Sequence, residues 1–159
     1  MSSEIPLFRR SGRLVAVCGC VLAGVAARPA AAALGDTVSS VARDQVAMRG
    51  TLSVTRMQSF DVHQLVDAHG QTVREYADRA GNIFAVTWNG RRSPDLKQLL
   101  GAYYGRYVAA AALHKTGHHV LSIHTPELAL SIVRAQRSAF GRAYLPARLP
   151  GGVTRAELR

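Results

Sequence analysis

Hydrophobic residues recur at every second position in residues 60–68, 72–78 and 83–88. This period is typical of strands that bury one face. A short turn at His69-Gly70 and a longer one at residues 79–82 lie between them. The pattern therefore predicts a three-stranded antiparallel meander.

The expected turn lengths predict the register of this meander. A two-residue turn at His69-Gly70 places Val66 opposite Val73 and Val62 opposite Ala77. A four-residue turn then predicts three further pairs: Phe84 with Ala77, Val86 with Glu75, and Trp88 with Val73. All three strands would share one apolar face, which is the arrangement that burial favours.

A helix is expected after the meander. Ser93 is a suitable N-cap, Pro94 suits the first turn, and Asp95 lies near the positive end of the helix dipole. Apolar residues continue at helical spacing towards His114-Lys115, and Gly117 can end the helix. The spaced apolar residues are Leu96, Leu99, Leu100, Tyr103, Tyr107 and Val108. A weaker pattern in residues 38–48 indicates a short helix capped by Asp36 or Thr37.

Alternation resumes in residues 120–124, 128–133 and 139–145, with a turn near Gln136-Arg137. The sequence thus predicts an α+β domain with an antiparallel sheet of five to six strands and one amphipathic helix packed on one face. The predicted core consists of Val62, Val66, Val73, Phe84, Val86, Trp88, Leu96, Leu100, Tyr103 and Tyr107.

The first 33 residues have the three parts of a secretory signal peptide: a basic front, an apolar middle and small residues at the end. The apolar run, residues 14–27, is shorter than the roughly 20 residues of a transmembrane helix. We expect a signal peptide at 1–33, one domain at 34–150, a tail at 151–159 and no transmembrane segment in the mature chain. Cys18 and Cys20 would leave with the signal peptide, unless one is the acylated residue of a lipoprotein.

The chain is basic, with a formal net charge of +10. Removal of residues 1–33 leaves 16 basic and 9 acidic residues, a net charge of +7. Such a charge favours anionic partners, although a solvated basic surface also keeps a protein soluble. Because we expect export to the periplasm or beyond, we expect no nucleic-acid partner. The partner would be an envelope protein or an anionic envelope component.

Several ordered motifs resemble those of a family of exported proteobacterial proteins of unknown function, DUF2844. The motifs are Thr72–Tyr76, Asn82–Gly90, Pro94–Leu96 with Leu99–Gly101, Phe140–Pro146 and Leu149-Pro150. The resemblance covers nearly all of the expected mature chain. It implies export from a Gram-negative cell and supplies no catalytic residues.

Glu75 is the most prominent candidate for chemistry, because the predicted register places it on the apolar face. A buried carboxyl group must be paired or protonated. It is either an acid or base with a raised pKa, or one partner of a structural ion pair with Arg106 or Arg142. The register places His63 and Tyr76 on the opposite face.

The histidines between His114 and His124 do not predict a metal site. Consecutive strand residues such as His118 and His119 point to opposite faces, and zinc needs three or four converging ligands. No nucleophile elbow, P-loop or dinucleotide-binding motif occurs in the sequence. Arg91 and Arg92 beside Trp88 could bind an anion or a glycan, but they also suit a solvated loop. The tyrosines of the expected helix, Tyr103, Tyr104 and Tyr107, are more typical of a core than of a ligand platform.

We therefore expect a protein without catalytic activity, cofactor or metal, acting as an envelope-associated binding or assembly accessory. One alternative is an exported hydrolase that uses Glu75 with a nearby histidine. Another is a basic module that binds anionic lipid or glycan, which requires arginines gathered on one face. The candidate functional surface comprises Glu75, Tyr76, Trp88, Arg91, Arg92 and Arg142.

We predict that protein recovered from the periplasm lacks both cysteines. The reason is that Cys18 and Cys20 lie within the expected signal peptide. Intact-mass measurement checks this expectation. A mass that retains either cysteine, or that includes acyl chains, would contradict cleavage to a soluble mature form.

Overall fold

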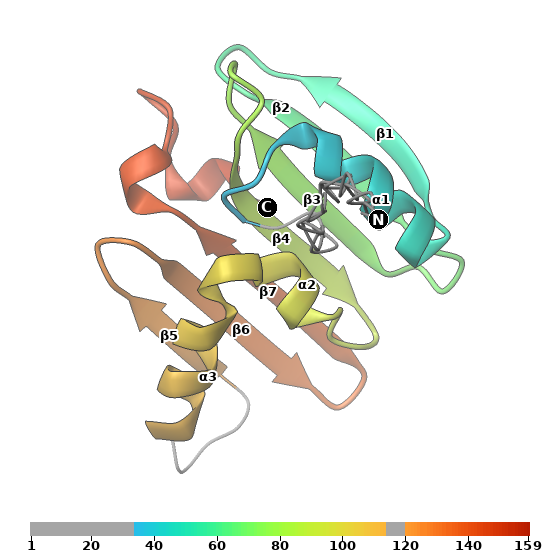
Figure 1. Cartoon of the computed structure of the whole chain (residues 1–159). Coiled ribbons are helices and arrows are strands. Elements are labelled where there is room, and N and C mark those ends of the chain that lie inside the picture. The colour runs from blue at the N-terminus through green and yellow to red at the C-terminus, as the bar shows by residue number, and fades with distance from the viewer. Residues whose placement is uncertain (1–33, 114–119) are drawn as a thin grey trace, which may run out of the picture.

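The computed structural model describes residues 34–113 and 120–159. These residues form an α+β fold around one antiparallel sheet with the spatial order β1-β2-β3-β4-β7-β6-β5 (Figure 1). The strands are β1 Thr51–Arg56, β2 Asp61–Val66, β3 Thr72–Ala77, β4 Ile83–Gly90, β5 Val120–His124, β6 Ala129–Ala135 and β7 Ser138–Tyr144. The fold class is as predicted, but the sheet has seven strands rather than five to six. The alternation had not singled out β1 as a strand, because five of its six residues are exposed.

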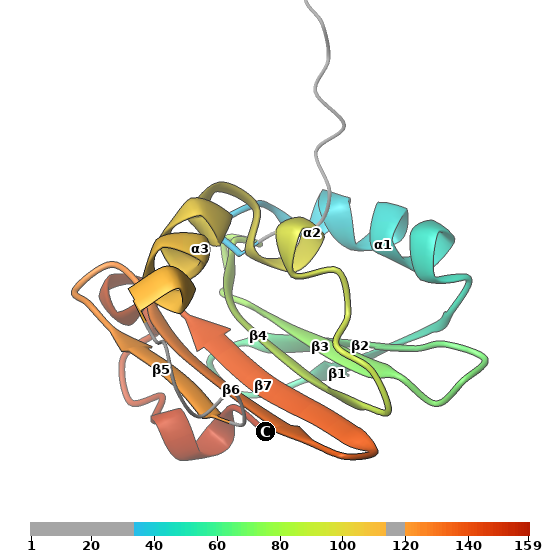
Figure 2. The same ribbon diagram turned by 90° about the horizontal axis from the view of Figure 1, so that it is seen from below.

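The helices lie on one side of this sheet and the C-terminal segment lies on the other (Figure 2). The α-helices are α1 Val41–Met48, α2 Leu96–Leu100 and α3 Tyr104–Leu113. Short 3-10 turns are η1 Val38–Ser40, η2 Gly101–Tyr103, η3 Pro146–Arg148 and η4 Arg155–Glu157. We call the two sides of the sheet the helix face and the outer face. No helix of the described residues is long and apolar enough to span a membrane.

The helix boundaries differ from the sequence expectation. Asp95 rather than Ser93 is the N-cap of α2, because its carboxylate accepts hydrogen bonds from the backbone N–H groups of Lys97 and Gln98. The expected single helix is interrupted at Gly101, which has a φ of 49°. Thr37 is the residue before η1 and makes no side-chain capping bond. The expected helix end at residues 114–117 lies outside the described residues.

Two hydrophobic clusters sandwich the sheet. On the helix face, Leu96, Leu99 and Leu100 of α2 pack in one cluster with sheet residues. The sheet and N-terminal members of that cluster include Leu34, Val41, Leu65, Val73, Ile83, Val86, Trp88, Leu130, Ile132 and Ala143. The outer-face cluster consists of Phe60, Tyr76, Phe84, Ala85 and Leu158. Residues 151–159, expected as a tail, thus contribute the buried Leu158 to this second cluster.

The β2–β3 register is one residue away from the predicted one. Leu65, rather than Val66, lies opposite Val73. The turn is longer than expected, because the Asp67 carboxylate accepts hydrogen bonds from the backbone N–H groups of His69 and Gln71. A one-residue slip exchanges the two faces of a strand. Val62 and Val66 were predicted as core residues on the same face as Val73, and this prediction is wrong. Val62 packs against the outer cluster instead.

The β3–β4 register is correct for two of the three predicted pairs. Val73 lies opposite Trp88 and Glu75 opposite Val86. A register shift between Tyr76 and Ala77 then pairs Ala77 with Ile83 instead of Phe84. A bulge of this kind inserts one residue and redirects the side chains beyond it. Phe84 consequently lies on the outer face, and its ring centroid is 5.9 Å from that of Phe60.

The core of the helix face depends on a close approach between Trp88 and Gly141 of the neighbouring strand. Trp88 is 2 % exposed, and a Cβ atom on Gly141 would lie 2.2 Å from the indole ring. We expect Gly141→Ala to destabilise the protein by about 1–3 kcal/mol, the usual cost of overpacking. Denaturant titration measures this change in the free energy of unfolding.

The matched control is Gly105→Ala in α3, where a Cβ atom meets nothing within 4 Å. Replacing a helical glycine by alanine there should leave stability unchanged or raise it by up to about 1 kcal/mol. Equal effects of the two substitutions would show that the Trp88 contact does not limit packing.

Candidate functional site

A row of polar side chains crosses the whole outer face, one residue from each strand. Each member lies directly opposite the next in the register of the sheet, and directly opposed residues point to the same face. In spatial order the row is Ser53, Gln64, Arg74, Thr87, Arg142, Ser131 and Ser122. With strands about 4.8 Å apart, the row is roughly 30 Å long. We call these seven residues the polar row.

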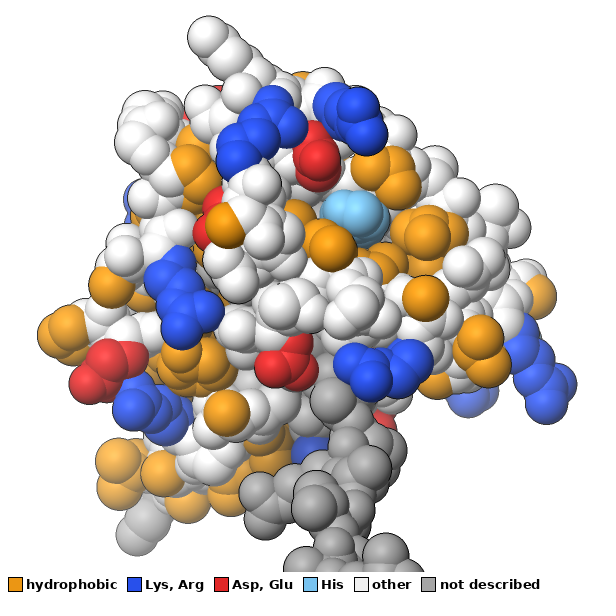
Figure 3. All heavy atoms as spheres, turned by 45° about the horizontal axis from the view of Figure 1, so that its top comes forward, with side chains coloured by type: hydrophobic (Ala, Val, Ile, Leu, Met, Phe, Trp, Pro, Cys, Tyr) orange, Lys and Arg blue, Asp and Glu red, His pale blue; other side chains and the backbone are white. Residues whose placement is uncertain are grey.

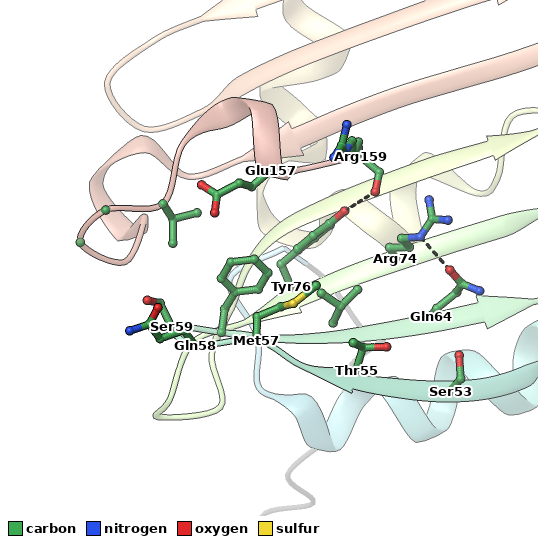
Figure 4. Close-up of a pocket in the computed structure, with 15 residues that line it drawn as sticks. Ser53, Thr55, Met57, Gln58, Ser59, Gln64, Arg74, Tyr76, Glu157 and Arg159 are labelled. Carbon is green, nitrogen blue, oxygen red and sulfur yellow. Dashed lines mark hydrogen bonds between the residues drawn. The ribbon is translucent and has the colours of Figure 1, made fainter.

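Three adjoining hollows follow the polar row. The first, of about 750 Å³, is lined by Ser53, Gln64 and Arg74 and reaches the apolar side chains of Met57 and Val153 (Figure 4). The second, of about 440 Å³, shares Arg74 with the first. The third, of about 180 Å³, shares Arg142 with the second. Because neighbouring hollows share lining residues, we call the three together the outer groove.

Positive charge dominates the lining of the outer groove. Its arginines are Arg74, Arg142, Arg155 and Arg159, whereas Glu157 is its single acidic residue. The Glu157 carboxylate already accepts hydrogen bonds from the backbone and hydroxyl of Thr154. In contrast, basic and acidic side chains are interspersed on the face of the molecule seen in Figure 3.

The C-terminal segment forms one wall of the outer groove. Arg142 of β7 donates hydrogen bonds from Nη1 to the carbonyl oxygens of Arg155 and Leu158, at 2.9 and 3.2 Å. The Tyr76 hydroxyl donates a bond of 2.8 Å to the backbone oxygen of Arg159. These bonds hold the wall against β3 and β7 of the sheet.

Arg74 is held in an orientation suited to binding. Its Nε donates a 2.7 Å hydrogen bond to the Gln64 side-chain oxygen, as Figure 4 shows. No acidic residue among the described residues forms an ion pair with it. Its terminal guanidinium nitrogens therefore remain for a ligand, and a guanidinium group binds carboxylates and phosphates in a fork geometry.

The structure disperses the residues proposed from the sequence. Arg142 belongs to the polar row and Tyr76 lines the first hollow. Trp88 packs its indole ring against Gly141 in the helix-face core, and it is also one of the residues that line the second hollow. Arg91 and Arg92 line a separate hollow of about 480 Å³ with Asp67, His69 and Gln71. Three candidate residues thus line the outer groove, whereas Arg91, Arg92 and Glu75 do not.

Glu75 is completely buried on the helix face, and its neighbour is another carboxyl group. Asp44 of α1, 1 % exposed, lies against it, and the Gln98 side chain of α2 donates a hydrogen bond of 2.5 Å to Asp44. Burial, followed by the charge of Asp44 and a hydrogen bond to it, raises the pKa of Glu75 to about 9. Glu75 is therefore protonated at neutral pH, and the two carboxyl groups can share its proton.

The partners expected for Glu75 were wrong. Arg106 pairs with Glu127, and Arg142 points to the outer face. His63, predicted on the opposite face, lies directly opposite Glu75 on β2 because of the register change. Burial lowers the pKa of His63, while the nearby Asp61 carboxylate opposes this effect. A glutamic acid and a histidine are thus adjacent, but Glu75 lines neither the outer groove nor the hollow that contains Arg91 and Arg92.

The described residues contain no group of three histidine, cysteine, aspartate or glutamate side chains placed to hold a metal ion. His124 lines the third hollow of the outer groove. The other members of the predicted histidine series, His114, His118 and His119, lie outside the described residues.

Most of the polar row was missed at the sequence level. Its members occupy the polar positions of the alternating strands, and polar residues are expected at those positions simply because they face solvent. Each strand contributes one residue to the row, so no local motif marks it. An accurate register across all seven strands could have revealed it.

The fold and the groove together describe a small α+β domain with a seven-stranded antiparallel sheet and a basic outer face. The chain matches the family described as "Protein of unknown function (DUF2844)" over residues 30–158. It therefore belongs to that family, as its motifs indicated. No curated protein and no solved structure matches it.

The carboxyl pair predicts a pH-dependent stability. The folded protein keeps a proton on Glu75 up to about pH 9, whereas the unfolded chain releases it near pH 4–5. The folded state thus binds more protons between these limits, so stability should fall as pH rises, by at most about 1.4 kcal/mol per pH unit. Glu75→Gln should flatten this slope, because glutamine has no proton to lose. Denaturant titrations between pH 5 and pH 9 measure it.

Glu127→Gln is the control, since Glu127 is an exposed partner of Arg106 and surface ion pairs contribute little. It should retain the slope of the parent protein. If Glu75→Gln also retains that slope, the buried pair is not its source.

Proposed function

We propose that this protein is a non-catalytic, envelope-associated binding domain that recognises an anionic envelope component in its outer groove. The observation that carries the proposal is the polar row, in which Arg74 and Arg142 flank Thr87 and line the same hollow of the outer groove. Export is inferred from the signal-peptide pattern of residues 1–33. A binding site needs complementary charge and shape, and this groove offers both.

The burial of Glu75 supports a binding role over the alternative of a hydrolase. A general acid or base must come within hydrogen-bond reach of its substrate. Glu75 is 0 % exposed beneath α1 and lies against the Asp44 carboxyl group. His63 lies opposite Glu75 in the register but is only half-buried, and the group that acts on Glu75 is the Asp44 carboxyl.

The gathered arginines support an anionic partner in particular. A basic module was expected to need its arginines on one face, and four of them line the outer groove. The hollow that contains Arg91 and Arg92 also contains Asp67, which partly offsets their charge. The outer groove is thus the better anion site of the two.

We predict that the exported protein, immobilised and exposed to its own envelope extract, retains a component that the double variant Arg74→Gln, Arg159→Gln fails to retain. The two arginines line the same hollows, so their removal takes two positive charges from the groove. Composition analysis of the eluted material measures retention.

The double variant Arg91→Gln, Arg92→Gln loses the same charge from the separate hollow and should behave as the parent protein. Equal retention by both double variants would contradict a site in the outer groove. Substrate turnover that disappears in Glu75→Gln would contradict a non-catalytic function.

A further inference from the structure

We propose that the ligand of the outer groove is a linear acidic polysaccharide whose chain lies along the polar row, across the strands of the sheet. This inference rests on the binding function proposed above and names the chemical class of the ligand. It is argued from the direction of the groove, the chemistry of its floor and the spacing of its charges.

The direction of the groove favours side-chain recognition. The polar row runs perpendicular to the strands, and the backbone groups of the inner strands beneath it are paired within the sheet. A peptide that adds to a sheet instead lies parallel to an edge strand and uses its backbone hydrogen bonds. A ligand along the row must therefore be bound by hydroxyl, amide and guanidinium groups.

The floor of the groove matches a ligand rich in hydroxyl groups. Ser53, Ser122 and Ser131 each provide one donor and two acceptor lone pairs, and the Gln64 amide provides both kinds of group. Thr87 lies at the buried middle of the row, with its hydroxyl 3.4 Å from that of Tyr76. Sugars carry donors and acceptors at similar density. The hollows also contain apolar residues such as Met57, Phe140 and Leu158, so an anionic phospholipid is the competing ligand that the experiment below compares with the polysaccharide.

The charges are spaced for a polymer with repeated carboxylates. Arg74 and Arg142 are separated by one strand, β4, so their Cα atoms lie two strand spacings or roughly 10 Å apart and both side chains rise from the same face. That separation is close to the length of a disaccharide. One carboxylate on each alternate sugar could thus meet one arginine, and fork-shaped guanidinium groups bind carboxylates well.

An apolar surface lies beside the polar row where a sugar ring could rest. Phe140 on β7 is 44 % exposed and lies opposite Asn89 and Val133 in the next row of the outer face. It lines the same hollow as Arg74 and Arg142. An exposed ring beside hydrogen-bonding groups can contact the C–H face of a sugar.

The test is calorimetric titration of the exported protein with alginate oligosaccharides of increasing length. Alginate is a polyuronate, so it supplies a carboxylate on every sugar. We expect affinity to rise with length until the chain spans the polar row and then to level off. Arg74→Gln should weaken binding about tenfold, the usual effect of losing one charged hydrogen bond. Arg91→Gln, which removes the same charge outside the groove, should leave affinity unchanged.

Ser53→Glu provides a second variant at an exposed position, where folding is not at risk. It places a negative charge at the end of the row and should weaken the longest oligosaccharides more than the shortest ones. Thermal melts of all three variants should match that of the parent protein. A loss of alginate binding only in variants that also melt early would overturn the proposal.

Titrations with other ligands distinguish a polysaccharide ligand from the broader proposal that the groove binds some anionic envelope component. Dextran, which is neutral, should bind much more weakly than alginate. Polyglutamate, polyphosphate or vesicles of anionic phospholipid that bind as tightly as alginate would overturn the polysaccharide assignment. Absence of alginate binding, with envelope retention still dependent on Arg74 and Arg159, would overturn this inference alone. Loss of that dependence would overturn the proposed function as well.

Discussion

The register of the β2–β3 hairpin is the constraint on which both faces of the molecule depend. The Asp67 carboxylate holds the turn by accepting two backbone hydrogen bonds, and Gly70 adopts a φ of 77° within it. This turn pairs Leu65 with Val73 on the helix face and Gln64 with Arg74 on the outer face. A shift by one residue would turn one of the two strands over, which would expose Leu65 and bury Gln64, or expose Val73 and bury Arg74.

The core beneath α1 contains a pair of carboxyl groups. The pairing of Glu75 with Val86 on β4 directs Glu75 inward, where Asp44 approaches from α1 and Gln98 from α2. Two ionised carboxylates in such a dry site would repel each other strongly, so one proton must remain. The docking of α1 on the sheet is thereby coupled to protonation of this pair. The two carboxyl groups form a polar contact between α1 and the sheet within an otherwise hydrophobic cluster.

On the outer face, tertiary structure turns dispersed polar residues into one groove. The polar row draws on all seven strands, and the C-terminal segment supplies its wall through bonds from Arg142 and Tyr76. Leu158 anchors that wall in the outer cluster together with Phe60 and Phe84. The hydrophobic contact and the hydrogen bonds support the same placement, so the groove is a stable feature of the fold. Its width follows from the packing of a segment that sequence patterning treated as a tail.

The sequence by itself determined the fold class, most strand positions, the family and the inward direction of Glu75. These follow from period-two alternation, helix-forming residues and ordered motifs, which act locally along the chain. Only the tertiary structure decided the β2–β3 register, the bulge that sends Phe84 outward, and the partner of Glu75. The length of a turn and the insertion of one bulge residue depend on hydrogen bonds and packing between distant segments. For the same reason the polar row was not visible in the sequence, because its seven members become neighbours only when every strand is in register.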